Sequence, residues 1–349
     1  MLARAKVDSE FVLVVALLET LWAASLIGAA PLIIQAQVKA KAQPSAVTRS
    51  RQGQHPKATG KRVLSSQSAA ATRRPSPVSF RVARDRGLLV ETWIDGSGPY
   101  TFAIDTGAGT TVISDRLAAE AHVSLKSGRR ASVSGLSGIS RLSTREALLH
   151  SLALGEPDNL LPANRTAIVS SGLPAELDGI LDPTDAYFPF GYSIDIPQRR
   201  INAFDCAIDP LSIYNPPTGG TVVRWLMDGT SRRPFVRLDD GRLALLDTGS
   251  SFGLAVSQDS DIAQTGRRRE AQDIGGGTVI SRRVEPSTIS IGSLTLRRVP
   301  TDIIYGAERG APTLLGRDAL YPFSLAFDPI HRLIEIAPAE SEQGKGLYH

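Results

Sequence analysis

The chain has few of the residues that cross-link a small exported protein or bind a metal. It contains one cysteine, Cys206, among 349 residues, so no disulfide can form within it. We expect this lone cysteine to be a small buried apolar residue. The five histidines (55, 122, 150, 331 and 349) show neither metal-ligand spacing nor a Ser/His/Asp arrangement, so no metal and no cofactor are predicted.

Acidic residues are missing from one long stretch. Residues 37–84 contain eleven Lys or Arg and no Asp or Glu, and they show no apolar period. Residues 37–79 are therefore predicted to be a disordered basic linker, either a solvated spacer or a segment that lies on anionic lipid. Because the whole chain has a net charge of only +4, the remainder is mildly acidic, which argues against a nucleic-acid partner.

One long apolar run is present near the N-terminus. Residues 11–38 are mostly apolar, carry no charge apart from Glu19 and are long enough to span a bilayer. We predict that residues 1–36 are a membrane anchor or, alternatively, a signal peptide, with membrane contact through residues 11–38. A membrane-anchored or exported (periplasmic or extracytoplasmic) protein is expected, although the positive-inside rule would place the basic linker in the cytoplasm.

The sequence Asp-Thr-Gly occurs twice, at 105–107 and 247–249, each time after an apolar run. A single copy is a weak signal, because Asp and Gly are ordinary turn residues. However, residues 185–195 and 318–328 also share Asp-Ala, Pro-Phe and a final Asp at a constant offset of 133. An Asp-Gly turn precedes each copy as well, at 95–96 and 240–241. These matches predict that the chain is one half-unit built twice.

Short β-type runs, separated by Gly, Pro and Asp turns about every 8–12 residues, predict an all-β architecture. Short helices are expected at residues 114–121, with Ser114 as the N-cap, and around residues 318–320. The expected strands include residues 88–94, 100–104, 148–154, 221–226, 243–246, 288–291 and 325–327.

Over roughly residues 80–337, these motifs resemble the retropepsin-like and pepsin-like aspartic proteases. The resemblance implies a bilobal acid-protease fold, with two pseudo-twofold-related, β-barrel-like lobes and a cleft between them. Leu314-Leu315-Gly316 matches the family's apolar-apolar-Gly segment, whereas the first half has Ile180-Leu181-Asp182, a departure expected to weaken that half. The expected units are an N-terminal lobe at 80–205, an inter-lobe linker at 206–220, a C-terminal lobe at 221–338 and a tail at 339–349.

The resemblance also implies a chemistry, in which Asp105 and Asp247 share one proton and activate a water as general acid and general base. The chain would then be an aspartic-type endopeptidase that acts on extended peptides or proteins as a monomer. A hydroxyl at Ser250, where the first copy has Ala108, predicts that Asp247 ionises more readily. The threonines are expected to hydrogen-bond between the lobes, and the residues that support the catalytic loops would be Thr106, Gly107, Thr248, Gly249 and Ser250.

Each half also has a Gly-rich hairpin candidate about 30 residues after its aspartate. We interpret these hairpins as substrate-binding flaps, because glycine lets the backbone approach a peptide closely; the alternative is ordinary surface hairpins. Two other functions stay open: a catalytically inactive peptide-binding module, and a scaffold whose basic linker is the functional part. The flap candidates are Gly135, Leu136, Gly138, Gly275, Gly276 and Gly277.

Overall fold

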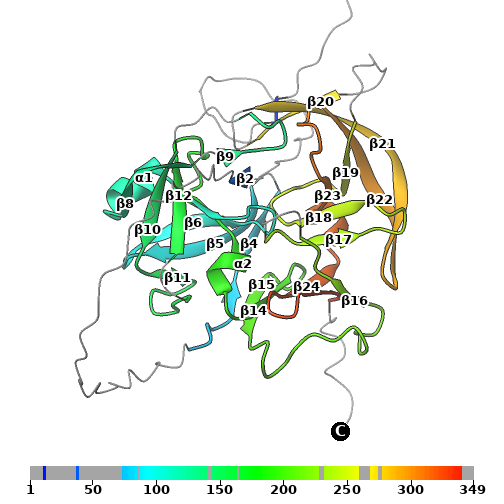
Figure 1. The fold of residues 1–349 in the computed structure, drawn as a ribbon, viewed down its shortest axis with the longest axis horizontal. Coiled ribbons are helices and arrows are strands. Elements are labelled where there is room, and N and C mark those ends of the chain that lie inside the picture. The colour runs from blue at the N-terminus through cyan, green and yellow to red at the C-terminus, as the bar shows by residue number, and fades with distance from the viewer. Residues whose placement is uncertain are drawn as a thin grey trace, which may run out of the picture.

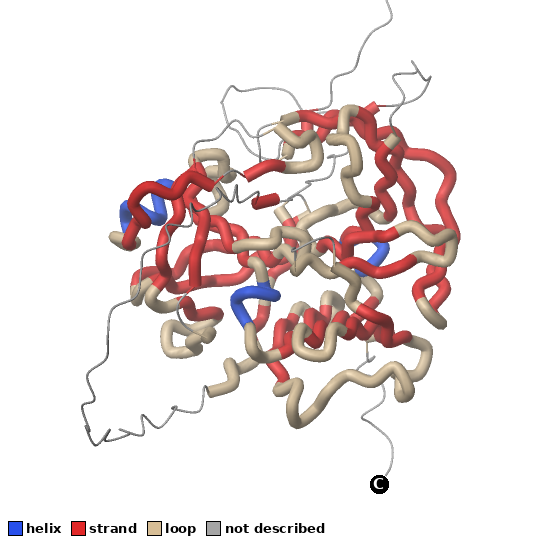
Figure 2. The backbone as a smooth tube through the Cα atoms, viewed as in Figure 1, coloured by secondary structure: helices blue, strands red, loops and turns tan. Residues whose placement is uncertain are grey.

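The computed structural model describes residues 73–84, 86–131, 133–139, 144–162, 165–227, 232–258, 268–273 and 277–339, together with 11–12 and 37–38. The predicted anchor, linker and tail therefore lie almost wholly outside the described residues. Within the described residues, no helix is long and apolar enough to cross a membrane. Strands dominate (Figures 1 and 2), which confirms the all-β prediction.

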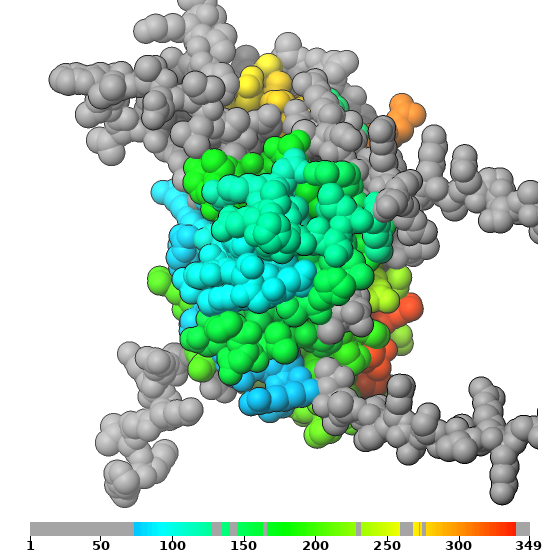
Figure 3. Space-filling view, turned by 90° about the vertical axis from the view of Figure 1, so that its left-hand side faces the viewer, coloured from blue at the N-terminus to red at the C-terminus, as the bar shows by residue number. Residues whose placement is uncertain are grey.

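The N-terminal half forms a nine-stranded sheet in the order β11-β5-β6-β13-β7-β12-β10-β8, with β4 paired to β5. Figure 3 looks onto this half, whose strands appear in cyan and green. The bounds are β4 (Arg81–Ala83), β5 (Gly87–Ile94), β6 (Ser97–Ile104), β7 (Thr111–Ser114), β8 (Ser124–Ala131), β10 (Thr144–Leu149), β11 (Leu152–Leu154), β12 (Arg165–Ser170) and β13 (Gly179–Leu181).

The C-terminal half forms an eight-stranded sheet that repeats this order. Its strands run β17-β18-β23-β19-β22-β21-β20, matching β5-β6-β13-β7-β12-β10-β8 one for one, with β1 (Phe11–Val12) at the edge. Both sheets are open within the described residues, so the closed, barrel-like shape expected for each lobe is not found. The bounds are β17 (Phe235–Arg237), β18 (Leu243–Asp247), β19 (Leu254–Ser257), β20 (Arg268–Gln272), β21 (Thr278–Ile291), β22 (Leu294–Tyr305) and β23 (Thr313–Gly316).

A six-stranded sheet joins the two halves at the lower edge of Figure 1, in the order β16-β25-β24-β14-β15-β3. At its centre β14 pairs antiparallel with β24, and Tyr192 stacks on Phe327 with ring centroids 4.8 Å apart. One buried apolar cluster contains residues of both halves. The bounds are β3 (Val78–Ser79), β14 (Gly191–Asp195), β15 (Arg200–Phe204), β16 (Thr221–Arg224), β24 (Phe323–Asp328) and β25 (Leu333–Pro338).

The local predictions hold where a short motif decides the conformation. Helix α1 (Asp115–Glu120) begins after Ser114, whose Oγ accepts the Leu117 N–H at 3.0 Å, as predicted. The Asp95-Gly96 turn joins β5 to β6 with both residues at positive φ, the backbone of a two-residue hairpin turn. The other helices are α2 (Pro183–Tyr187) and α3 (Arg317–Leu320).

Two strand predictions need correction. Residues 148–154 were expected to form one strand but belong to two, β10 and β11. The chain turns between them because Ser151 is tied to the Asp95 turn, through Asp95 N–H to Ser151 O (3.1 Å) and Ser151 N–H to Asp95 Oδ1 (2.8 Å). The strand expected at 288–291 is only the end of the 14-residue β21, whose charged, exposed side chains hide the strand pattern.

Candidate active site

Both aspartates stand at the carboxyl ends of central strands. Asp105 directly follows β6, and its N–H donates to Leu181 O of the parallel neighbour β13 at 3.0 Å. Asp247 is the last residue of β18 and is in register with Gly316 of the parallel strand β23. The equivalent strands of the two sheets therefore hold the two aspartates in equivalent positions.

The two Asp-Thr-Gly loops face one another. A Cβ on Gly107 would lie 2.8 Å from Asp247 Cγ, and a Cβ on Gly249 would lie 2.5 Å from Asp105 Cγ. Each glycine therefore makes room for the carboxyl group of the opposite half, and no larger residue fits there without displacing it. Both aspartates are fully buried, with 0% of their surface exposed.

Thr106 and Thr248 hydrogen-bond to each other's loops in a reciprocal pattern. Thr248 Oγ1 accepts the Thr106 N–H at 3.1 Å, and Thr106 Oγ1 accepts the Thr248 N–H at 3.0 Å. The hydroxyls in turn donate to carbonyls of the opposite strand, Thr106 to Leu246 O (2.7 Å) and Thr248 to Ile104 O (3.1 Å). Four buried hydrogen bonds thus fix the separation and orientation of the two loops.

The electrostatic environment favours a proton on Asp105. Burial raises the pKa of its carboxyl group well above the ordinary value, and the negative charge of nearby Asp247 raises it further. The Gly107 N–H, which donates to Asp105 Oδ1 at 2.8 Å, opposes this rise in pKa only partly. Asp105 Oδ2 is buried and has no hydrogen-bond partner among the described residues.

Asp247 receives its backbone hydrogen bond from a different position in its loop. The Ser250 N–H donates to Asp247 Oδ1 at 2.9 Å. The Ser250 hydroxyl oxygen, expected from the sequence to reach the carboxylate, accepts the Phe252 N–H at 3.3 Å. The stabilising contact from Ser250 to Asp247 in this structure is therefore the backbone amide.

Asp182, which replaces the expected glycine, has a structural role that the sequence interpretation missed. Its Oδ1 accepts the Thr184 N–H at 2.9 Å and caps α2, and Pro183 occupies the first helical position. Strand β13 still pairs with β6 and β7, just as β23 pairs with β18 and β19. The local signal was present in the sequence as Asp-Pro-Thr, which is typical of a helix start.

Asp182 is also a buried acid close to the pair of aspartates. Burial raises its pKa to about 7, the charge of Asp185 adds to this, and hydrogen bonds from backbone amides oppose it. The charge of Asp182 in turn contributes to the raised pKa of Asp105. The three acids therefore form one electrostatic group.

The flap candidates that the structure describes meet each other. Asp273, just beyond β20, accepts the Ser137 N–H at 2.8 Å and the Gly277 N–H at 3.0 Å. Leu136 is 1% exposed and packs in an apolar cluster of the C-terminal half, while its carbonyl accepts the Glu308 N–H at 2.8 Å.

The flap prediction had not included Asp273, because a lone aspartate beside a Gly-rich turn carries no distinctive sequence signal. Gly138 stands at positive φ (69°) in the first hairpin. Gly275 and Gly276 lie outside the described residues. The role of these hairpins in substrate binding stays a prediction.

The site is built from carboxyl, hydroxyl and amide groups. Across the described residues, no three His, Cys, Asp or Glu side chains gather in a way that could hold a metal ion. Cys206 is free and buried, as the sequence predicted, and burial raises the pKa of its thiol to about 12.

Comparison with known families agrees with this geometry in the first half. A family model described as aspartyl protease matches residues 90–181, which include the first Asp-Thr-Gly loop and β13. The comparison with curated proteins returned no significant match. The match supports an aspartyl protease domain, and the strand order of the second sheet repeats that of the first.

Proposed function

We propose that this chain is an aspartic endopeptidase with Asp105 and Asp247 as its catalytic pair. The observation that carries the proposal is the facing arrangement of the two Asp-Thr-Gly loops, in which each glycine lies against the aspartate of the opposite half. Because one chain supplies both aspartates, a monomer suffices. The aspartyl protease match over residues 90–181 supports the same class of hydrolase.

In the proposed mechanism the two carboxyl groups share one proton. Asp105, with its raised pKa, holds the proton, and Asp247 is ionised. Asp247 removes a proton from a water, which attacks the peptide carbonyl carbon, while Asp105 donates its proton to the carbonyl oxygen. Asp247 then gives the proton it took from the water to the amine nitrogen as the C–N bond breaks, and Asp105 recovers a proton from a hydroxyl of the tetrahedral intermediate. The products are a carboxyl group and an amine, and no covalent enzyme intermediate forms.

A substrate can reach the pair only if the chain that covers it moves, because both aspartates are fully buried. Asp273 accepts hydrogen bonds from the Ser137 N–H and the Gly277 N–H, which links described residues of the two hairpin candidates. We propose that these hairpins separate to admit an extended peptide and close over it by backbone pairing. An anchored or exported location, which would bring the site to extracytoplasmic proteins, belongs to the same proposal.

The proposal is tested with the full-length protein and a mixed peptide library, scanned from about pH 3 to about pH 8. We expect cleavage at acidic pH that disappears in Asp247→Asn, with Asp240→Asn, an exposed turn residue, as the matched control. Saturable peptide binding without cleavage at any pH would instead support the inactive peptide-binding module.

A further inference from the structure

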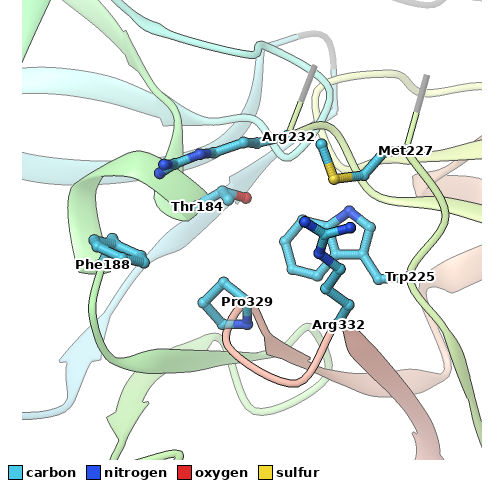
Figure 4. Close-up of a pocket in the computed structure, with 7 residues that line it drawn as sticks. All are labelled: Thr184, Phe188, Trp225, Met227, Arg232, Pro329 and Arg332. Atoms are coloured by element: carbon cyan, nitrogen blue, oxygen red, sulfur yellow. The ribbon is translucent and has the colours of Figure 1, made fainter. Parts of the chain in front are cut away.

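A pocket of about 140 Å³, lined by neither Asp105 nor Asp247, lies where three segments of the chain meet (Figure 4). The first segment is α2 and its end. The second consists of Trp225, Met227 and Arg232, and the third is the turn between β24 and β25. Among the described residues, those that line the pocket are Thr184, Phe188, Trp225, Met227, Arg232, Pro329 and Arg332. Both halves of the chain contribute, and neither catalytic aspartate is among these residues.

The floor of the pocket offers mainly apolar contacts to a ligand, because its polar groups hydrogen-bond within the protein. Trp225 is only 5% exposed and packs edge-on against Phe327, and its indole N–H donates to Arg233 O at 3.0 Å. The Thr184 hydroxyl is 2.8 Å from the Tyr192 hydroxyl and is already engaged there. Since these polar groups already have partners within the protein, the inner part of the pocket favours an apolar group of a ligand. A volume of about 140 Å³ is close to that of a cavity known to hold benzene.

The rim of the pocket is cationic. Arg232 and Arg332 are exposed, and neither forms an ion pair with a residue in the described part of the chain. The Arg232 guanidinium lies over the Phe188 ring, 5.0 Å from its centroid, which leaves its N–H edges available for an anion. In Figure 4, Arg232 passes above Thr184 with its guanidinium toward the side of Phe188, and Arg332 lies on the other side of Thr184, where its guanidinium overlaps Trp225 in this view.

Asp182, a buried acid whose carboxyl group interacts electrostatically with Arg232, offsets the charge of this rim only as the pH approaches 7 and above. Asp182 caps α2 behind Thr184, and its pKa is raised to about 7 by burial, so its carboxyl group is largely protonated in acidic solution. Asp328, which precedes Pro329, is buried and accepts hydrogen bonds from the backbone N–H groups of Ile330 and His331. Asp328 is paired with His331, and neither Asp182 nor Asp328 forms an ion pair with Arg232 or Arg332, so both guanidinium groups can contact a ligand.

We propose that this pocket binds a small aromatic carboxylate, with the ring on the Trp225 floor and the carboxylate between Arg232 and Arg332. A guanidinium and a carboxylate form paired, charge-assisted hydrogen bonds, and the ring matches both the volume and the aromatic walls. Two sources share this chemistry: a free aromatic acid, and the C-terminal Phe or Tyr of a peptide. Neither Asp105 nor Asp247 lines the pocket, so this proposal does not depend on the proposed function.

The test is a calorimetric titration of the full-length protein with 3-phenylpropionate. We expect saturable binding that weakens about tenfold or more in Arg232→Gln and in Arg332→Gln, because each loses a charged hydrogen-bond partner. These variants should fold because both side chains are exposed. Arg332 has a positive φ, but replacing one non-glycine residue by another there adds no new backbone strain. Arg297→Gln, an exposed arginine on β22 outside the pocket, is the matched control and should bind as the parent protein does.

Three comparisons make the test specific. 3-Phenylpropanamide, which lacks the charge, and acetate, which lacks the ring, should each bind at least about tenfold more weakly than the acid. Asp247→Asn should bind 3-phenylpropionate with unchanged affinity, because the catalytic pair is not part of the pocket. Equal binding of acid and amide, equal weakening in Arg297→Gln, or no saturable binding would overturn the proposal.

The source of the carboxylate is resolved by two short peptides that end in Phe, one with a free C-terminus and one amidated. Binding of the free-ended peptide alone would identify a chain terminus as an occupant. Binding of 3-phenylpropionate with exclusion of both peptides would restrict the pocket to free aromatic acids. Equal binding of the two peptides would contradict recognition of the carboxylate and count against the proposal.

Discussion

The two halves of the chain share their strand order but differ in the turn that follows β13 and β23. In the second half Gly316 is tightly enclosed, because an added Cβ would collide with Phe252 O, and α3 has no side-chain cap. In the first half Asp182 occupies the corresponding place and caps α2 with its carboxyl group. The same topology therefore accepts glycine or aspartate there, depending on how closely the neighbouring loop approaches.

The two halves also place different charged groups near their aspartates. The first half carries a second buried acid, Asp182, whose charge adds to the raised pKa of Asp105. The residue at the corresponding place in the second half is a glycine. Instead, Arg317 is buried beside Gly316, and its guanidinium donates to Arg84 O at 2.9 Å, across to the first half. A duplicated scaffold has thus given its two aspartates different surroundings, which suits a shared proton.

The strongest test of whether the two halves are equivalent is to remove each of the two carboxylates that we propose to be catalytic. Asp105→Asn and Asp247→Asn should each lower kcat by about 10²–10⁴, because an acid and a base are both needed. The double variant should be little worse than either single one, since the two residues act as a unit. Steady-state peptide cleavage measures this, with folding checked by circular dichroism. A single variant that keeps full activity would show that only one half carries the chemistry.

The next largest effect should come from Asp182→Asn, which keeps the helix cap but cannot ionise. Because the pKa of Asp182 rises from 3.8 to about 7 on folding, its contribution to stability is full below about pH 4 and is lost as the pH rises through about 7. The asparagine variant should therefore gain up to about 4 kcal/mol over the parent protein between pH 4 and pH 8. Urea unfolding at both pH values measures the gain.

Asp240→Asn provides a control for that experiment, because the pKa of Asp240 is shifted in the opposite direction to that of Asp182. Its exposed carboxyl group has a lowered pKa because Arg242 hydrogen-bonds to it, so any stabilisation it provides is lost as the pH falls. The Asp182→Asn gain should be absent from this variant. The buried-acid assignment would be contradicted if the difference in unfolding free energy between the parent protein and Asp182→Asn were the same at both pH values.

A smaller effect is expected from the threonines that link the loops. Thr106→Val and Thr248→Val should each lower the free energy of unfolding by about 1–3 kcal/mol, because each leaves a buried N–H and a buried carbonyl without their partners. The two losses should not add, since the side chains belong to one network. Thermal unfolding measures both; strict additivity would mean that the two loops are held independently.

The smallest effect should come from Ser250→Ala, which makes the second loop resemble the first at Ala108. The variant loses the acceptor of the Phe252 N–H, worth about 1 kcal/mol, but keeps the backbone N–H that donates to Asp247. The pH–rate profile should therefore change little. A clear rise in the lower apparent pKa would show that the hydroxyl, rather than the amide, stabilises the Asp247 carboxylate.

Conformations that depend on a few neighbouring residues could be predicted from the sequence. Conformations that depend on contacts between distant residues could not. The Asp-Thr-Gly copies, the Asp-Gly turns and the Ser114 cap each specify their conformation within a few residues. By contrast, the split between β10 and β11 depends on a turn more than 50 residues away, at Asp95.

The same limit applies to the two sites. Leu136 is buried by side chains of the other half, so its position in the sequence does not reveal that it is fixed. Arg232 and Arg332 belong to no common motif, and only the joining of the halves brings them to one pocket.

The central six-stranded sheet has a consequence for how the chain folds as it is synthesised. Strand β14 leaves the ribosome well before β24, its partner, and until β24 arrives the edge that carries Tyr192 has nothing to pair with. The first half therefore emerges with an open sheet edge and an uncovered aromatic face, the kind of surface that chaperones bind. Completion of the fold waits for nearly the last strand of the chain, so a protein truncated before residue 323 should be cleared by proteolysis rather than accumulate as a folded half.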